Sequence, residues 1–433
     1  MICVRPPPRS IFRLNLCFAI FPRRFLLTVA ACCPKQGELG EKPRGIWAPI
    51  AASLDLHRGP FEFWIVDLTA KRRIGLGILY SLSGNYYLIS KACRAGALSA
   101  IAAINADPGC DLEFVSVERD PQGNVDLYGP LCEEILRDSG ANHVVGCVTS
   151  WSRKEVIPTL EKHGGSLWYA VPYEGFEASD HIVYTHACPN QHLLPLLNWA
   201  MPKFGSRGFL TGSNYIWGWE INRLARDRVT LAGGEVLGER YLPIGSRDID
   251  RVMEEIRLAR PDFVLNSLIG PSSYAFMSAY CELGLSDRHF RPERCPILSC
   301  NLTECELPTL GAAAEGLIAA GPYFRGIPGW PRRQRDFGSS HEAAAFTSVM
   351  ELARLLAHRP GAEQLSLAKL LAECSGSGGI IDLETHHTVL PVIIAQVRGG
   401  VFQPLKRLEG VAGDPYLTRG RNFPTSPLLR VVS

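Results

Sequence analysis

The sequence is short of the features that mark several large classes of protein. Its 45 Lys and Arg residues nearly balance its 43 Asp and Glu residues, and no basic run is interleaved with aromatic residues. A net charge of +2 gives no indication that the protein binds nucleic acid or an anionic membrane. No stretch approaches the roughly 18 consecutive apolar residues that predict a membrane-spanning helix. We therefore expect no direct nucleic-acid contact and no membrane span.

Motifs for metal binding and catalysis are also missing. The 14 Cys residues are scattered, with no CxxC pair and no Cys/His cluster at zinc spacing, which favours reduced thiols in the core. Neither GxxxxGK[ST] nor GxSxG occurs, and Gly75-Leu76-Gly77 lacks the third glycine of a dinucleotide-binding turn. Cys147 and His143 would lie roughly 13 Å apart on one strand, too far for a nucleophile and its base. We expect no enzyme activity, no catalytic residue, no cofactor and no metal.

Residues 1–70 do not share the pattern of the rest of the chain. They show no sustained hydrophobic period, although Arg23-Arg24 precede an apolar run at 25–31. If this is an export signal, Cys32 would begin a lipidated, periplasmic protein. The apolar run is at the short limit for such a signal. We therefore expect residues 1–70 to be an extension outside the fold, and the protein to be cytoplasmic.

From Lys71 onward, apolar strand patterns alternate with helical patterns. Strands are predicted at 74–80, 113–117, 143–148, 167–171, 182–186, 208–210, 236–241, 263–267, 297–300, 317–320, 389–397 and 400–405. Helices are predicted at 86–105, 126–138, 152–163, 190–204, 220–231, 249–259, 274–283, 341–358 and 365–374. Alternation of this kind predicts parallel, doubly wound sheets. The fold class is therefore α/β, with two doubly wound parallel-sheet lobes and a hinge of crossover strands.

The lobe boundaries are placed where Pro and Gly interrupt the periodic segments, near Pro189 and Gly321. Lobe I is expected to comprise residues 71–188 and 321–380. Lobe II is expected to comprise residues 189–320 and 381–417, followed by a tail at 418–433.

Two strand ends close together in sequence predict a binding pocket. Residues 145–154 and 169–176 each run from an apolar strand into a polar loop. Ligands of open α/β sheets sit just outside the carboxyl ends of the strands. The groups there are mostly neutral hydrogen-bonding side chains and aromatic rings, which suit an uncharged polar ligand. A second interpretation stays open, in which these polar residues only cap the helices that follow.

Several of these segments resemble a known family. They are Gly146 to Pro158, Pro172 to Glu177, Pro189 to Gln191, Gly212 to Trp217, Gly400 to Pro404 and Asp414 to Tyr416. The chain is similar to the type I periplasmic-binding-protein family over roughly residues 72 to 417. Within it, the resemblance is to the AmiC-type amide-sensing negative regulators of the amidase operon and to urea or short-chain amide binding proteins of ABC transporters.

This resemblance implies two lobes that close over a ligand. It gives Ser150 and Tyr215 the roles of ligand-holding hydroxyls, whereas Val171 stands where the family has Thr. Val148 stands where an aromatic residue is common, and Trp217 where Tyr is common. The predicted ligand-binding residues are Ser83, Val148, Thr149, Ser150, Tyr169, Val171, Pro172, Tyr173, Tyr215 and Trp217.

Two functions follow from the resemblance. The first is a cytoplasmic sensor of a short-chain amide or urea-like ligand, which regulates an amidase-type operon by releasing an RNA-binding antiterminator protein. The alternative is the substrate-binding component of a urea, short-chain amide or branched-chain amino acid type ABC transporter, which docks to a permease. The family also implies a homo-oligomer.

Overall fold

The computed structural model of the chain describes residues 71–177, 179–331, 335–373 and 379–418. The chain divides into two compact units, residues 1–70 and 71–433. The first unit, with its candidate export signal, lies outside the described residues, as does the tail beyond residue 418.

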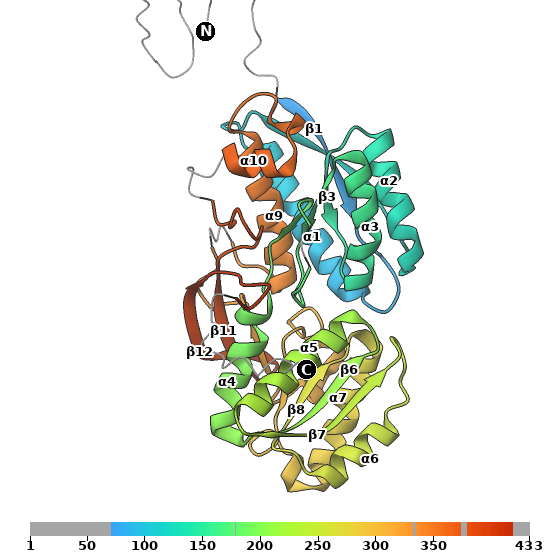
Figure 1. The fold of residues 1–433 in the computed structure, drawn as a ribbon, viewed down its shortest axis with the longest axis vertical. Helices are drawn as coiled ribbons and strands as arrows, with labels where there is room; N and C mark the ends of the chain where they lie inside the picture. The colour runs from blue at the N-terminus through green and yellow to red at the C-terminus, as the bar shows by residue number, and fades with distance from the viewer. Residues whose placement is uncertain (1–70, 178, 332–334, 374–378, 419–433) are drawn as a thin grey trace, which may run out of the picture. The chain divides into compact units, whose positions relative to one another are not determined.

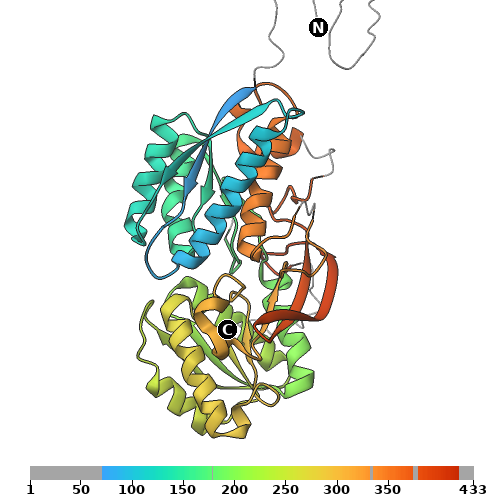
Figure 2. The ribbon, with the colours of Figure 1, turned by 180° about the vertical axis from the view of Figure 1, so that it is seen from behind.

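Five parallel strands form the sheet of the first lobe (Figure 1). Their order is β2 (Leu112–Arg119), β1 (Arg72–Leu79), β3 (His143–Gly146), β4 (Ser166–Tyr169) and β5 (Ile182–Tyr184). β3 and β4 are buried along their whole length, as expected for strands covered on both faces. The covering helices are α1 (Tyr87–Ala106), α2 (Tyr128–Asp138), α3 (Ser150–His163), α9 (Ser340–Leu356) and α10 (Leu367–Glu373). α1 and α9 pack side by side, in blue and orange in Figures 1 and 2.

Seven strands form the sheet of the second lobe. Their order is β12 (Val401–Val411), β11 (Leu390–Arg398), β10 (Ile318–Gly321), β9 (Ile297–Ser299), β8 (Phe263–Ser267), β6 (Arg207–Ser213) and β7 (Glu235–Leu242). β7, β6, β8, β9 and β10 run parallel, and the β11–β12 hairpin continues the sheet antiparallel to β10. The helices of this lobe are α4 (Leu193–Phe204), α5 (Ile216–Leu231), α6 (Asp250–Ala259), α7 (Gly270–Ser286) and α8 (Leu307–Leu310).

The predicted fold class is confirmed: two α/β lobes with parallel sheets, joined by crossovers. The chain passes between the sheets after β5, after β10 and after α10. α9 therefore returns to pack on α1, while β11 and β12 complete the second sheet. The residue-level lobe boundaries stay predictions.

The sequence pattern predicted that Cys147 lies within a strand. This prediction is wrong. β3 ends at Gly146, and Cys147 has a φ of 63°, in the left-handed region, which breaks the parallel ladder. Its thiol is buried and donates to the backbone oxygen of Ser152 at 3.4 Å. Burial raises the pKa of this thiol well above its ordinary value, so it stays protonated and packs as a small apolar group.

One helix among the described residues, α1, is long and apolar enough in composition to cross a membrane. In the fold it is a core helix. Its buried residues, among them Cys93, Ala97 and Ala100, pack against the sheet and against α9. Length and composition therefore carry little weight here as evidence for a membrane span.

Glu306 is a carboxylic acid enclosed by the second lobe. Its side chain is fully buried, and its Oε1 accepts a hydrogen bond from the Tyr274 hydroxyl at 3.0 Å. Its Oε2 has no partner among the described residues. Burial raises the pKa of Glu306 to about 7, so the carboxyl is neutral in the folded protein at pH values where the unfolded chain would ionise it.

We expect this carboxyl to make stability depend on pH. Between about pH 4.5 and 7 Glu306 keeps its proton in the folded state and loses it in the unfolded state, so the contribution of Glu306 to the free energy of unfolding falls as pH rises, by up to roughly 3 kcal/mol. Glu306→Gln should remove this contribution, so the free energy of unfolding of the variant should rise relative to that of the wild type in urea titrations between pH 5 and 8. Glu155→Gln, at an exposed position, removes the same charge and should leave the slope unchanged. Equal slopes in all three proteins would contradict the assignment.

Candidate functional site

A small cavity lies where strand ends of the two lobes face each other. Its wall is formed by Tyr86, Ile89, Val148, Thr149, Ser150, Tyr169, Val171, Pro172, Tyr215, Trp217, Ile269, Asn301 and His341. The first lobe contributes the loops after β3 and β4 and the starts of α1 and α9. The second lobe contributes the loops after β6, β8 and β9. The space open to the centre of a water molecule is about 30 Å³.

The structure brings together most of the residues that the sequence predicted for ligand binding. Val148, Thr149, Ser150, Tyr169, Val171, Pro172, Tyr215 and Trp217 all lie on the cavity wall. Ser83 and Tyr173 do not. Ser83 is exposed in the loop before α1, where Tyr86 takes the place on the wall. The Tyr173 ring packs on Tyr184 and His387 at the hinge, with centroid distances of 4.4 and 5.3 Å.

Five residues of the wall are absent from the predicted ligand-binding set. They are Tyr86, Ile89, Ile269, Asn301 and His341. Asn301 follows β9, so its position as a polar residue at a strand end was a usable signal. His341 reaches the wall from the first turn of α9, after a lobe crossing, and no local pattern marks it.

The first loop of the site both caps a helix and presents a free hydroxyl. Thr149 is the N-cap of α3, and its Oγ1 accepts from the Ser152 backbone N–H at 3.1 Å. Ser152 Oγ in turn accepts from the Thr149 N–H, which completes a capping box. Ser150 is the next residue, and no hydrogen bond of its Oγ is recorded among the described residues. The capping interpretation therefore holds for Thr149, and the ligand-binding role of Ser150 stays a prediction.

A buried ion-pair network supports the cavity wall from behind. The Arg153 side chain is fully buried, and its guanidinium lies 2.6 Å from Glu174 and 2.7 Å from Glu177. The same group lies over the rings of Tyr169 and Tyr173, at 4.9 and 4.8 Å from their centroids. Burial alone would raise the pKa of Glu177, but the charge and hydrogen bonds of Arg153 outweigh burial and lower it.

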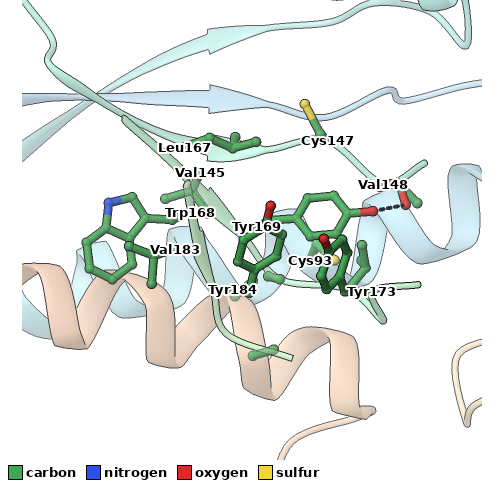
Figure 3. Close-up of a cluster of buried hydrophobic side chains, with 14 of the residues drawn as sticks. Cys93, Val145, Cys147, Val148, Leu167, Trp168, Tyr169, Tyr173, Val183 and Tyr184 are labelled. Atoms are coloured by element: carbon green, nitrogen blue, oxygen red, sulfur yellow. Dashed lines mark hydrogen bonds between the residues drawn. The ribbon is translucent and has the colours of Figure 1, made fainter. Parts of the chain in front are cut away.

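The network fixes Tyr169, whose ring lines the cavity. Figure 3 shows its hydroxyl directed at the backbone oxygen of Val148, to which it donates at 3.1 Å. This bond joins the loop after β3 to the end of β4, and so links the two predicted halves of the site. The Arg153 guanidinium, which belongs to α3, also packs on a face of the Tyr169 ring. Contacts of Tyr169 therefore connect α3 with both parts of the site.

The wall carries no charged side chain among the described residues. Its one titratable imidazole is His341, and burial lowers the pKa of His341 to about 4, so the ring is neutral near pH 7. His341 packs edge-on against His186 at 5.4 Å, and burial, followed by the two neighbouring imidazoles, lowers the pKa of His186 as well. The site is therefore electrically neutral.

The lobes touch on more than one side of the cavity. Trp151 of α3 packs on Tyr215 at 5.2 Å, and Arg223 of α5 lies over Phe176 at 4.8 Å. Elsewhere, Asn85 lies against the start of α7. There Gly270 has a φ of 57°, and an added Cβ would lie 1.9 Å from the Asn85 backbone oxygen. The absence of a side chain at Gly270 is therefore a condition for this contact.

Residues 74–422 match the family model described as a periplasmic binding protein domain. The chain belongs to this family. It is a family of binding proteins, which supports the prediction that the chain is not an enzyme.

Individual relatives extend the match. The chain is similar to the Leu/Ile/Val-binding protein homolog 6 of Brucella abortus (strain 2308), with 24% identity over 257 residues, 58% of this chain and 64% of that protein. It thus spans less than two thirds of the length of this relative.

Solved structures share the fold. An ABC transporter solute binding protein from Rhodopseudomonas palustris HaA2, in complex with p-hydroxybenzoic acid, aligns with a TM-score of 0.70 and 19% identity over 80% of this chain and all of that chain. The branched-chain amino acid transporter substrate binding protein LivJ of Streptococcus pneumoniae, in complex with isoleucine, aligns with a TM-score of 0.65 and 14% identity over 78% of this chain and 99% of that chain.

The predicted cytoplasmic location is wrong. The family is that of periplasmic binding proteins, and the similar proteins named above include binding proteins of transporters. The expectation rested on the apolar run at residues 25–31, which was judged too short for an export signal.

Removing the buried charge at the centre of the support should unfold the site. Arg153→Leu leaves Glu174 buried without its ion-pair partner and leaves Glu177 with Lys154 alone, so we expect a loss of about 3–5 kcal/mol in the free energy of unfolding. Arg137→Leu breaks an exposed pair with Asp138 and should cost at most about 1 kcal/mol. Urea titrations of the two variants measure this difference. Similar losses would show that the Arg153 network does not support the fold.

A side chain at Gly270 should hold the lobes apart. We expect Gly270→Ala to increase the radius of gyration measured by small-angle X-ray scattering, because its Cβ would collide with the Asn85 backbone. Gly233→Ala is the matched control, since Gly233 also has a positive φ, of 73°, but nothing lies within 4 Å of an added Cβ. An unchanged radius in Gly270→Ala would mean that the chain closes without this contact.

Proposed function

We propose that the chain is the solute-binding component of an ABC transporter, acting on the periplasmic side, and that its solute is a short-chain amide or urea-like molecule. The observation that carries this proposal is the neutral cavity between the lobes. Its wall combines aromatic rings with hydroxyl groups and holds no charged side chain among the described residues.

The size of the cavity favours a solute with few atoms. One water needs about 10–15 Å³ by this measure of volume, so the space of about 30 Å³ corresponds to roughly two or three waters. Acetamide and urea approach this size. Isoleucine and p-hydroxybenzoate, bound by two proteins of the same fold, are much larger.

The neutrality of the cavity disfavours amino acids as solutes. An ammonium group taken out of water needs a carboxylate or an equivalent set of acceptors to offset its desolvation. The carboxylates of Glu174 and Glu177 lie behind the wall, but the charges of Arg153 and Lys154 already balance them. An uncharged amide carries no such cost, because neutral hydrogen bonds suffice to replace its hydration.

Closure couples solute capture to transport in this proposal. Ser150 lies on the first lobe, and Tyr215 and Trp217 lie on the second, so a solute that contacts both favours the closed form by its differential affinity. The closed form would then be presented to a membrane permease. A cytoplasmic amide sensor acting on an antiterminator is not proposed, since the family match overturns the location that it requires.

Calorimetric titration of acetamide, urea, L-leucine and benzoate tests the solute class. We expect acetamide and urea to bind more tightly than the two larger solutes. Ser150→Ala and Tyr215→Phe should each weaken acetamide binding by roughly fivefold, which corresponds to about 1 kcal/mol for a neutral hydrogen bond.

Ser83→Ala serves as the matched control, because Ser83 also follows a strand end but lies outside the cavity. It should leave the affinity unchanged. Tighter binding of L-leucine than of acetamide would sink the proposed solute class, and equal losses in Ser83→Ala and Ser150→Ala would mean that the site is misplaced.

A further inference from the structure

Trp217 lines the cavity and carries an unpaired hydrogen-bond donor. The residue lies in the first turn of α5, is 4% exposed and forms part of the cavity wall. Its Nε1 has no hydrogen-bond partner among the described residues. A buried donor that is left unpaired has lost its hydrogen bond to water without gaining another, which destabilises the folded protein. A donor in this position on a cavity wall is therefore a candidate for pairing with whatever fills the cavity.

The aromatic ring in contact with Trp217 is that of His192, and it cannot accept a hydrogen bond from the indole N–H. His192 lies 6.0 Å from Trp217 by ring centroids. Its Nδ1 already accepts from the Leu193 N–H at 2.6 Å. This assigns the proton to Nε2, which donates to the backbone oxygen of Tyr173 at 3.1 Å. Both ring nitrogens of His192 are thus engaged, and the indole N–H of Trp217 finds no partner there.

Two other indole N–H groups are paired, one buried and one exposed. The indole of Trp330 donates to Thr347 Oγ1 at 2.9 Å, and that of Trp219 donates to Asn214 Oδ1 at 3.0 Å. Trp168 Nε1 is also unpaired, but Trp168 is enclosed in the core of the first lobe and does not line the cavity. Of the two described tryptophans with a buried, unpaired indole nitrogen, Trp217 is thus the one whose side chain lines the cavity.

We propose that Trp217 is a specificity-determining residue whose indole N–H donates a hydrogen bond to a carbonyl oxygen of the solute. This inference rests on the proposed function. It narrows the class of solute, because an indole nitrogen donates a hydrogen bond and cannot accept one. A Tyr hydroxyl at this position could do both. The solute must therefore present an acceptor oxygen towards α5, and a solute that presents an N–H or ammonium group there is rejected.

Acetamide and thioacetamide test this selection directly. They share one planar skeleton, but sulfur is larger than oxygen and is a weaker hydrogen-bond acceptor. In calorimetry we expect the wild type to bind acetamide roughly tenfold more tightly than thioacetamide. Trp217→Phe keeps an aromatic ring without the N–H, and should reduce this preference to about twofold or less. A loss of packing alone would lower the affinity for both ligands equally and would leave the preference for acetamide unchanged.

A second measurement follows the indole proton itself. In a protein labelled with ¹⁵N, the Trp217 indole signal is the one that disappears in Trp217→Phe. We expect it to move downfield when acetamide is added, while the Trp168 indole signal stays in place. Trp168 is the matched control because its N–H is equally buried and unpaired but lies away from the cavity.

The two proposals fail in different ways. If acetamide binds but the oxygen preference survives in Trp217→Phe, or the Trp217 signal does not move, the role of Trp217 is overturned and the solute class stands. If neither acetamide nor urea binds the wild type, both are overturned.

Discussion

Arg153 carries its positive charge inside the first lobe, and the cavity wall is built around the groups that neutralise it. Its guanidinium reaches Glu174 and Glu177 on the loop after β4 and lies over the Tyr169 ring. A charge in such a place is tolerated only when its partners are held in good geometry. The need to neutralise one helix residue thus positions the loop that faces the second lobe.

The consequence for binding is a separation of charge from the cavity. The ionised groups pair with one another behind the aromatic wall, while the wall itself offers hydroxyl groups, an indole N–H and a neutral imidazole. In surroundings that exclude water, neutral hydrogen bonds discriminate by the direction of donation, and a charged solute is disfavoured by its desolvation. The inferred solute class follows from this neutrality together with the small volume between the lobes.

The parts of the site that the sequence predicted are those with local causes. Thr149 caps α3, and Ser150 follows it at the end of β3, so a strand, a loop and a helix start are enough to place them. Tyr173 was misplaced because its ring turns to the Tyr184 and His387 stack, and His387 comes from a distant crossover. His341 was missed for a similar reason, since it reaches the wall only because α9 returns to pack on α1.

The alternation of apolar strands and helices determined the α/β class and the edge of each sheet where a ligand could sit, because parallel strands place their carboxyl ends together. Only the tertiary structure decided which loops of the two lobes meet, how little space they leave and which donors remain unpaired. These properties depend on contacts such as that of Asn85 with Gly270, between residues far apart in the chain. No local sequence pattern predicts these properties, because the contacts between the lobes depend on the surfaces of both lobes.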